Sequence, residues 1–173
     1  MGKGRVLAIC ALAAAAATPL LAQDGEGINP FAMRLLQEHN HARDDVGVPR
    51  LAWSNRLASE AQDWAEELAR RGRMEHSTQE GRRGAGENLW MGSAGYYGPE
   101  VMIGAFVDER RMFRGGTFPQ VSTTGRWNDV GHYTQVVWRE TQEVGCAVAR
   151  GGGNDFLVCR YWPAGNVYDR QVF

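Results

Sequence analysis

The sequence is poor in lysine, in cysteine and in long apolar runs. Lys3 is the only lysine among 173 residues, so almost every cationic side chain is an arginine. The formal net charge of −1 argues against nucleic acid as a partner, because phosphate backbones attract strongly basic surfaces. Neither an HExxH nor a CxxC spacing occurs, so no metal site follows from spacing alone. Internal repeats and long linkers are also absent, which indicates a single domain.

The one long apolar stretch lies at the start of the chain. Lys3 and Arg5 precede an alanine-rich run that ends in a small residue, which predicts a secretory signal peptide over residues 1–22. An uncleaved N-terminal anchor is the alternative. Cleavage would leave a short leader, 23–29, and a domain, 30–173, with 17 basic and 20 acidic residues and a net charge of −3. We expect a secreted or periplasmic protein without stable membrane insertion, and the Ala- and Gly-rich composition suggests a bacterial source.

Two cysteines remain if Cys10 is removed with the signal. An even number in an exported protein suggests one disulfide. Two β-prone runs flank the loop RGGGND, and if Ala149 faces Phe156 across that hairpin, Cys146 lies opposite Cys159. Opposed Cα atoms in a non-hydrogen-bonded pair are about 4.5 Å apart, which a disulfide accepts. Two free thiols are the alternative.

Helices are predicted before this hairpin. The first begins at Asn29 and Pro30, a capping residue followed by a favourable first-turn residue. It continues to Gly47, and further helices are expected over 54–72 and 98–113. The segment 132–138 fits a short helix and a strand equally well. Helices followed by a hairpin indicate an α+β domain.

The third helix carries an acid on its apolar face. Met102, Phe106, Glu109 and Phe113 fall at i, i+4, i+7 and i+11, within one narrow stripe. Burying a carboxylate there costs free energy unless another group pairs with it. Such acids are either salt-bridged scaffolding or part of a functional site. Glu109 is therefore a candidate site residue.

Other titratable residues are scattered along the chain. His39 and His41 lie two residues apart on the first helix, hence on different faces, and we expect them to serve packing or to face solvent. His76 follows the second helix, and His132 lies between a glycine and an aromatic residue. Glu87 sits between a glycine turn and apolar residues, where alone it would be a capping or turn carboxylate.

These residues would form a recognisable site if they converged. Two imidazoles with two carboxylates suit a divalent metal, especially Zn²⁺. Without metal the same groups could act as acid and base. Ser77 is the one nearby hydroxyl that could be a nucleophile, but neighbouring residues such as His76 and Ser77 rarely face each other productively.

Several blocks of sequence resemble one known family. GHYTQVVWRET (131–141), VGCA (144–147) and FLVCRYWPAGNV (156–167) follow HNHAR, VPRLAWS, AQDWA and GENLW in order. The first two segments together resemble the first signature of the CAP superfamily, which includes cysteine-rich secretory, antigen 5 and plant pathogenesis-related class 1 proteins. The third resembles its second signature. The similarity covers about residues 30–167.

The resemblance implies a three-layer α–β–α sandwich, with a small antiparallel sheet between helices and a cleft on its surface. The family's cleft holds two His and two Glu, which correspond to His76, Glu87, Glu109 and His132. Zn²⁺ or another divalent cation can bind through the two histidines, without being obligatory. The pairing of the two cysteines agrees with a disulfide of the second signature. The animal members' C-terminal cysteine-rich module is missing, so its channel-blocking activity is not expected.

The resemblance leaves function open, because one scaffold hosts unrelated roles. The first hypothesis is a secreted binding module, with a metal-binding cleft and surface grooves for a small apolar ligand such as a lipid or sterol, or for a protein. The alternative is a metal-assisted or acid/base hydrolase, a peptidase or esterase, in which Glu87 or Glu109 activates water. The lack of a convincing nucleophile favours the binding module. An agent that attacks anionic membranes is a third hypothesis, against which the acidic charge argues.

Overall fold

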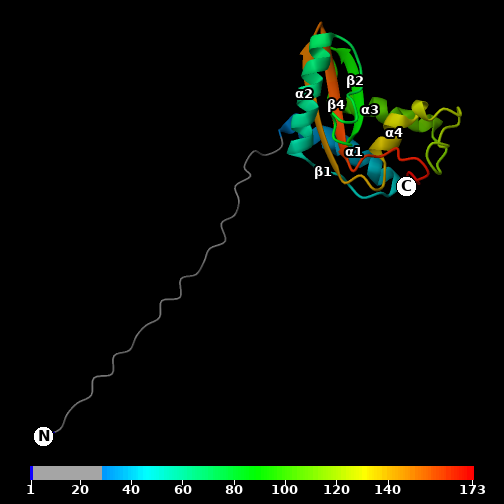
Figure 1. The fold of residues 1–173 in the computed structure, drawn as a ribbon, viewed down its shortest axis with the longest axis horizontal. Helices are drawn as coiled ribbons and strands as arrows, with labels where there is room; N and C mark the ends of the chain where they lie inside the picture. Colours follow the sequence, from blue (N-terminus) through cyan, green and yellow to red (C-terminus); the bar gives the residue numbers. More distant parts are fainter. Residues whose placement is uncertain (2–28) are drawn as a thin grey trace.

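The structure is a computed structural model that describes Met1 and residues 29–173. The expected signal peptide, 1–22, and nearly all of the leader lie outside the described residues. Figure 1 shows a sheet between helices. The elements are α1 (Pro30–Val46), β1 (Ala52–Trp53), α2 (Asn55–Arg71), β2 (Gly86–Ser93), α3 (Pro99–Val107), η1 (Asp108–Met112), η2 (Trp127–Asp129), α4 (Gly131–Val136), β3 (Glu143–Gly151) and β4 (Asn154–Trp162).

The sheet confirms the α+β prediction and differs from it in one detail. Its strand order is β1-β3-β4-β2, and β2, β4 and β3 pair antiparallel, as expected. The two-residue strand β1 pairs with β3 in parallel, so the sheet is mixed rather than purely antiparallel. A parallel partner is possible there because α2 intervenes between the two strands, which gives the chain the crossover that parallel pairing needs.

Two apolar clusters hold the three layers together. On one face of the sheet α2 contributes Ala61, Ala65 and Leu68, which pack against Phe156 and Val158 of β4. On the other face α1, α3 and α4 share a larger cluster with the sheet. Figure 1 shows α2 on one side of the strands, with α3 and α4 on the other. Each sheet face is therefore buried by helices.

The helix boundaries follow local chemistry. The Asn29 side chain accepts a hydrogen bond from the Ala32 N–H at 2.9 Å, which caps α1 before Pro30. Gly47 and Gly72 end α1 and α2 with φ of 69° and 65°, where a residue with a side chain would be strained. These ends match the prediction from sequence.

Two glycines of β3 let α2 lie directly on the sheet. A Cβ atom at Gly145 would come within 2.2 Å of the Ala58 backbone nitrogen, and one at Gly151 within 2.2 Å of the Ala69 carbonyl oxygen. Both clashes are with helix backbone, which cannot move aside as a side chain can. The close contact between α2 and β3 therefore requires glycine at both positions.

The hairpin of β3 and β4 has the predicted register. Ala149 lies opposite Phe156 and Cys146 opposite Cys159. The two cysteines form a disulfide with a Cα–Cα distance of 4.1 Å. Both are buried.

The third helix is shorter than predicted. α3 ends at Val107, and the chain tightens into the 3₁₀ helix η1, which ends before Phe113. The prediction that Phe113 lies on the same helical stripe as Met102 and Phe106 is therefore wrong, because a 3₁₀ turn advances side chains by a different angle. The ambiguous segment that follows Gly131 forms the short helix α4.

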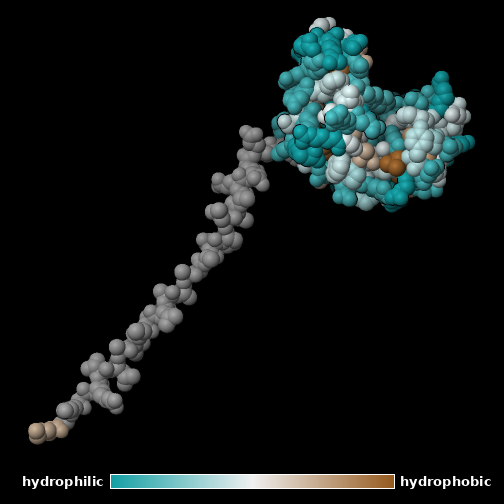
Figure 2. All heavy atoms as spheres, in the orientation of Figure 1, coloured by the Kyte–Doolittle hydropathy of each residue, from teal (hydrophilic) through white to brown (hydrophobic). Residues whose placement is uncertain are grey.

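The surface is mostly hydrophilic (Figure 2). Within residues 29–173 every ion pair has arginine or histidine as its cation. None of the helices described here is both long and apolar enough to cross a membrane.

Candidate functional site

Glu109 turns inward and meets the start of α4. Its Oε1 accepts a hydrogen bond from His132 Nδ1 at 2.6 Å. Its Oε2 accepts from the backbone N–H groups of His132 and Tyr133, at 2.9 and 3.1 Å. The His132 ring also stacks on Phe106, with 5.0 Å between ring centroids and 17° between planes. η1 and α3 thus fix both the position and the plane of this imidazole.

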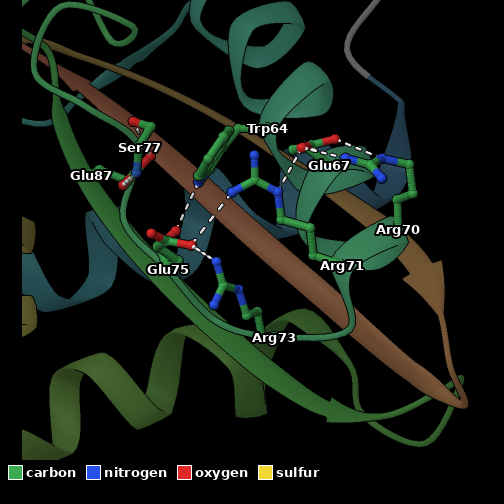
Figure 3. Close-up of polar contacts among 8 residues, drawn as sticks. All are labelled: Trp64, Glu67, Arg70, Arg71, Arg73, Glu75, Ser77 and Glu87. Atoms are coloured by element: carbon green, nitrogen blue, oxygen red, sulfur yellow. Dashed lines mark hydrogen bonds and ion pairs between the residues drawn. The ribbon is translucent and has the colours of Figure 1, made fainter.

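Glu87 forms a second carboxylate–histidine pair. Its Oε1 accepts from His76 Nδ1 at 2.7 Å and from the Ser77 N–H at 3.0 Å. Its Oε2 accepts from Ser77 Oγ at 2.9 Å, a contact visible in Figure 3. The carboxylate is 1% exposed, whereas the His76 side chain is 57% exposed. A buried acid therefore orients an accessible imidazole.

Arg160 supports Glu87 from the neighbouring strand. The register of β2 and β4 places the two residues opposite each other, and Arg160 Nη2 lies 3.1 Å from Glu87 Oε2. Burial has the largest effect on the pKa of Glu87 and raises it. The contacts with His76, Arg160 and Ser77 together outweigh burial, so this pKa lies below its ordinary value. Glu87 is therefore ionised at neutral pH.

The segment that carries His76 is tied to the end of α2. The Trp64 indole N–H donates to the Glu75 carbonyl at 3.0 Å, while Arg71 and Arg73 lie 3.4 and 2.8 Å from the Glu75 carboxylate. Figure 3 shows these contacts beside Ser77 and Glu87. The charged pairs are exposed and each contributes little to stability. Together they hold the backbone on which His76 sits.

One cavity brings the two pairs together. His76, Glu87 and His132 line a cavity of about 680 Å³, and Glu109 adjoins it through its contacts with His132. Gln135 of α4 also lines this cavity, although it is 2% exposed. Three of the four proposed cleft residues thus line one cavity, and the fourth, Glu109, holds His132 in place.

The remaining candidates lie elsewhere. His39 is fully buried: its Nδ1–H donates to the Leu35 carbonyl at 2.8 Å, and its Nε2 accepts from the Tyr161 hydroxyl at 2.8 Å. Burial lowers the pKa of His39 to about 4. It also raises the pKa of Tyr161 well above its ordinary value. Exposed His41 faces solvent, so both residues have the roles expected from their positions on α1.

His39 also lies beside the disulfide, but this cluster does not suit a metal. One nitrogen of His39 and the two sulfur atoms of Cys146 and Cys159 lie within 4.8 Å of one another. Metal binding needs thiolates, and both sulfur atoms are joined in the disulfide. Both ring nitrogens of His39 are also engaged in hydrogen bonds.

Ser77 is not arranged as a nucleophile. Its hydroxyl donates to Glu87, and so does His76 Nδ1. The imidazole is therefore turned toward the same carboxylate and not toward the serine oxygen. A serine-type mechanism needs a hydrogen bond between nucleophile and base.

The cavity offers imidazole nitrogens, a donor type that divalent cations such as Zn²⁺ accept. Each imidazole uses Nδ1 to bind a carboxylate, and within the described chain Nε2 of His76 and Nε2 of His132 have no hydrogen-bond partner. Carboxylates that hold the second nitrogen of metal-binding histidines are the usual outer partners of such sites. The residues present thus leave two imidazole lone pairs available on one cavity.

Sequence reasoning missed part of the site. Arg160 was not selected, since its role depends on the pairing of β2 with β4. Trp127 and Tyr168 also line the cavity, from the 3₁₀ helix η2 and from the segment after β4. The one usable signal was the position of both aromatic residues close to the two signature blocks.

The sequence matches the CAP family, described as the Cysteine-rich secretory protein family, over residues 36–161. Pathogenesis-related protein 1B of Nicotiana tabacum is 37% identical over 139 residues, covering 80% of this chain and 78% of that protein. Golgi-associated plant pathogenesis-related protein 1 of Homo sapiens is 34% identical over 144 residues, covering 83% and 89%.

A crystal structure of NaASP2 with Zn²⁺ has the same fold, with a TM-score of 0.73 at 26% identity, covering 86% of this chain and 88% of that one. BmVAL-1 also shares the fold, with a TM-score of 0.71 at 21% identity, covering 87% and 85%. The α–β–α sandwich and the family match lead to one conclusion. This chain belongs to the CAP family.

Proposed function

We propose that this chain is a secreted CAP-domain binding protein whose cleft holds a divalent cation through His76 and His132. The observation that carries the proposal is that two imidazoles on one cavity are each held at Nδ1 by a carboxylate, while Nε2 has no hydrogen-bond partner among residues 29–173. A bound Zn²⁺ would supply a Lewis acid that attracts a ligand oxygen or lowers the pKa of bound water. The NaASP2 structure contains Zn²⁺, which supports the same ion here.

Export is part of the proposal. The disulfide suits an oxidising compartment, and the family description names secretory proteins. We assign residues 1–22 to a signal peptide and 30–173 to the domain. A secreted or periplasmic location follows from this assignment.

A small apolar molecule or a protein is the proposed ligand outside the cleft. A separate cavity of about 810 Å³ lies between α1, α2 and β3. Phe31, Trp53 and Val148 contribute apolar surface to it. Its size is within the range of cavities that hold small molecules.

The carboxylates favour binding over hydrolysis. Each oxygen of Glu87 and Glu109 already accepts at least one hydrogen bond from a protein N–H or O–H group. A general base needs a free lone pair directed at the proton that it removes. Three of the roughly four lone-pair sites of each carboxylate are already engaged, and Ser77 is not activated.

Titration calorimetry with Zn²⁺ tests the proposal. We expect the His76→Ala/His132→Ala double variant to lose at least 100-fold in affinity, because both imidazole ligands are gone. His41→Ala is the matched control, since it removes an exposed histidine from α1 and should bind like wild type. Equal affinity in wild type and the double variant would remove the metal site.

A further inference from the structure

The lining of the cleft also has an aromatic part, beside the histidine pairs. Trp127 and Tyr168 line it, and both rest on the buried ring of Phe118, with centroid distances of 5.3 and 5.4 Å. Trp127 also lies against Gly131, where an added Cβ would come within 3.1 Å of the indole ring. Packing against Phe118 therefore holds the rings of Trp127 and Tyr168 in place at the cleft.

This rigidity does not serve the core alone. Tyr168 is 61% exposed, so most of its ring stays in contact with water. Phe118, by contrast, is 1% exposed and forms part of the core cluster. A fixed ring that remains open to solvent presents flat apolar surface to a ligand at little cost in conformational entropy.

Planar polar side chains line the same cavity. They share an amide or guanidinium group, and they are Gln79, Arg82, Asn88, Asn128, Gln135 and Asn166. Within residues 29–173 the side chains of Gln79 and Asn128 make no hydrogen bond, and both residues are exposed. Arg82 donates one N–H to the Ser77 carbonyl at 2.6 Å. Asn88 is 2% exposed and donates to the His132 carbonyl at 3.1 Å. Fixed and unused donors and acceptors thus lie beside the rings.

This lining disfavours the other ligand classes. A sterol or acyl chain placed here would remove water from the amides without replacing its hydrogen bonds, which is costly. A polyanion would find little positive charge here, because Arg82 is the one arginine in the lining and already donates to the Ser77 carbonyl. Neutral ligands with many hydroxyl groups meet neither obstacle.

We infer that this aromatic part of the cleft binds a neutral oligosaccharide. The apolar C–H face of a pyranose ring would lie on Trp127 or Tyr168, while its hydroxyl groups exchange hydrogen bonds with Gln79 and Asn128. A cavity of about 680 Å³ has room for more than an ion and falls within the range of small-molecule sites. The inference deepens the proposed binding function, since it names a ligand of the same cleft, but it does not require the metal.

Calorimetry with four defined tetrasaccharides tests the inference. The probes are cellotetraose, laminaritetraose, chitotetraose and mannotetraose, each titrated to about 5 mM against the full chain, in EDTA and again with Zn²⁺. We expect at least one to bind, and Trp127→Ala and Tyr168→Ala each to weaken that binding at least tenfold. Trp90→Ala and Tyr96→Ala are the matched controls, because they remove the same ring types outside this cavity.

Two outcomes would overturn the inference. One is that none of the four sugars binds. The other is that both cleft variants bind as wild type does. Thermal unfolding of each variant shows whether it folds, and if Trp127→Ala does not, Tyr168→Ala and Asn128→Ala alter exposed residues and decide the question.

The metal and sugar sites can fail separately. Wild-type protein that binds Zn²⁺ but no sugar would refute the inference and leave the proposed metal site intact. Sugar binding in EDTA that persists in the His76→Ala/His132→Ala variant would support the inference whether or not Zn²⁺ binds. Loss of sugar binding in Trp127→Ala with unchanged Zn²⁺ affinity would support both.

Discussion

At the scale of single residues, Glu109 links the apolar core to the cleft. It lies in η1, directly after the helix that buries Met102 and Phe106, and it accepts three hydrogen bonds from the start of α4. The sequence pattern selected Glu109 because an acid on an apolar stripe needs partners. Those partners are His132 and two backbone N–H groups.

Replacing this carboxylate should weaken the proposed metal site. In Glu109→Gln the amide cannot accept at both ends, so a donor faces either His132 Nδ1 or the backbone N–H groups. We expect Zn²⁺ affinity to fall about 10–100-fold. Calorimetry measures the change, with Glu140→Gln as an exposed control. Affinity within twofold of wild type would show that Glu109 does not orient His132.

His39 makes stability depend on pH. Burial lowers its pKa to about 4 from 6.5, so the unfolded chain binds a proton that the folded chain excludes. The contribution of neutral His39 to the unfolding free energy is complete above about pH 6.5 and is lost as pH falls toward 4. At roughly 1.4 kcal/mol per pKa unit the loss is about 3 kcal/mol.

Urea unfolding at pH 7 and pH 4 measures this effect. The difference in unfolding free energy between wild type and His39→Gln should shrink by about 3 kcal/mol at the lower pH. Exposed His41→Gln serves as control and should leave the pH dependence unchanged. Parallel curves for wild type and His39→Gln would contradict the assignment.

At the scale of elements, glycines decide how closely α2 approaches β3. Gly145→Ala would place a Cβ within 2.2 Å of helix backbone, so we expect it to destabilise the fold by about 1–3 kcal/mol or more. Gly104→Ala is the matched control: nothing lies within 4 Å of its added Cβ, and alanine in α3 should stabilise by roughly 0.5–1 kcal/mol. Chemical denaturation gives both values. Similar effects at both positions would refute the packing argument.

The elements also show how far sequence alone reaches. The ends of α1 and α2 and the Cys146–Cys159 register were predictable, because caps, glycine stops and a short hairpin depend on neighbouring residues. The tightening into η1 after Val107 was not predicted; in the structure Glu109 of η1 accepts hydrogen bonds from the start of α4, a segment distant in the sequence. Arg160 was missed for a similar reason: its pairing with Glu87 requires β2 to lie beside β4, a contact between distant segments.

At the scale of the whole molecule, one disulfide closes the hairpin at the centre of the sheet. The two cysteines are 13 residues apart, and linking them restricts the unfolded chain. The Cys146→Ala/Cys159→Ala variant should lose about 2–4 kcal/mol of unfolding free energy. Reductant should lower the urea midpoint of wild type and leave the variant unchanged. Insensitivity of wild type would mean that the bond contributes nothing to stability.

The absence of lysine from residues 29–173 has a practical consequence for measuring ligands. Amine-reactive reagents find no side-chain target between residues 29 and 173, because lysine is absent there. Such reagents therefore leave every side chain that lines the cavity of His76 and His132 unmodified. Protein labelled or immobilised through amines thus keeps its cleft chemistry intact for the ligands that are measured afterwards.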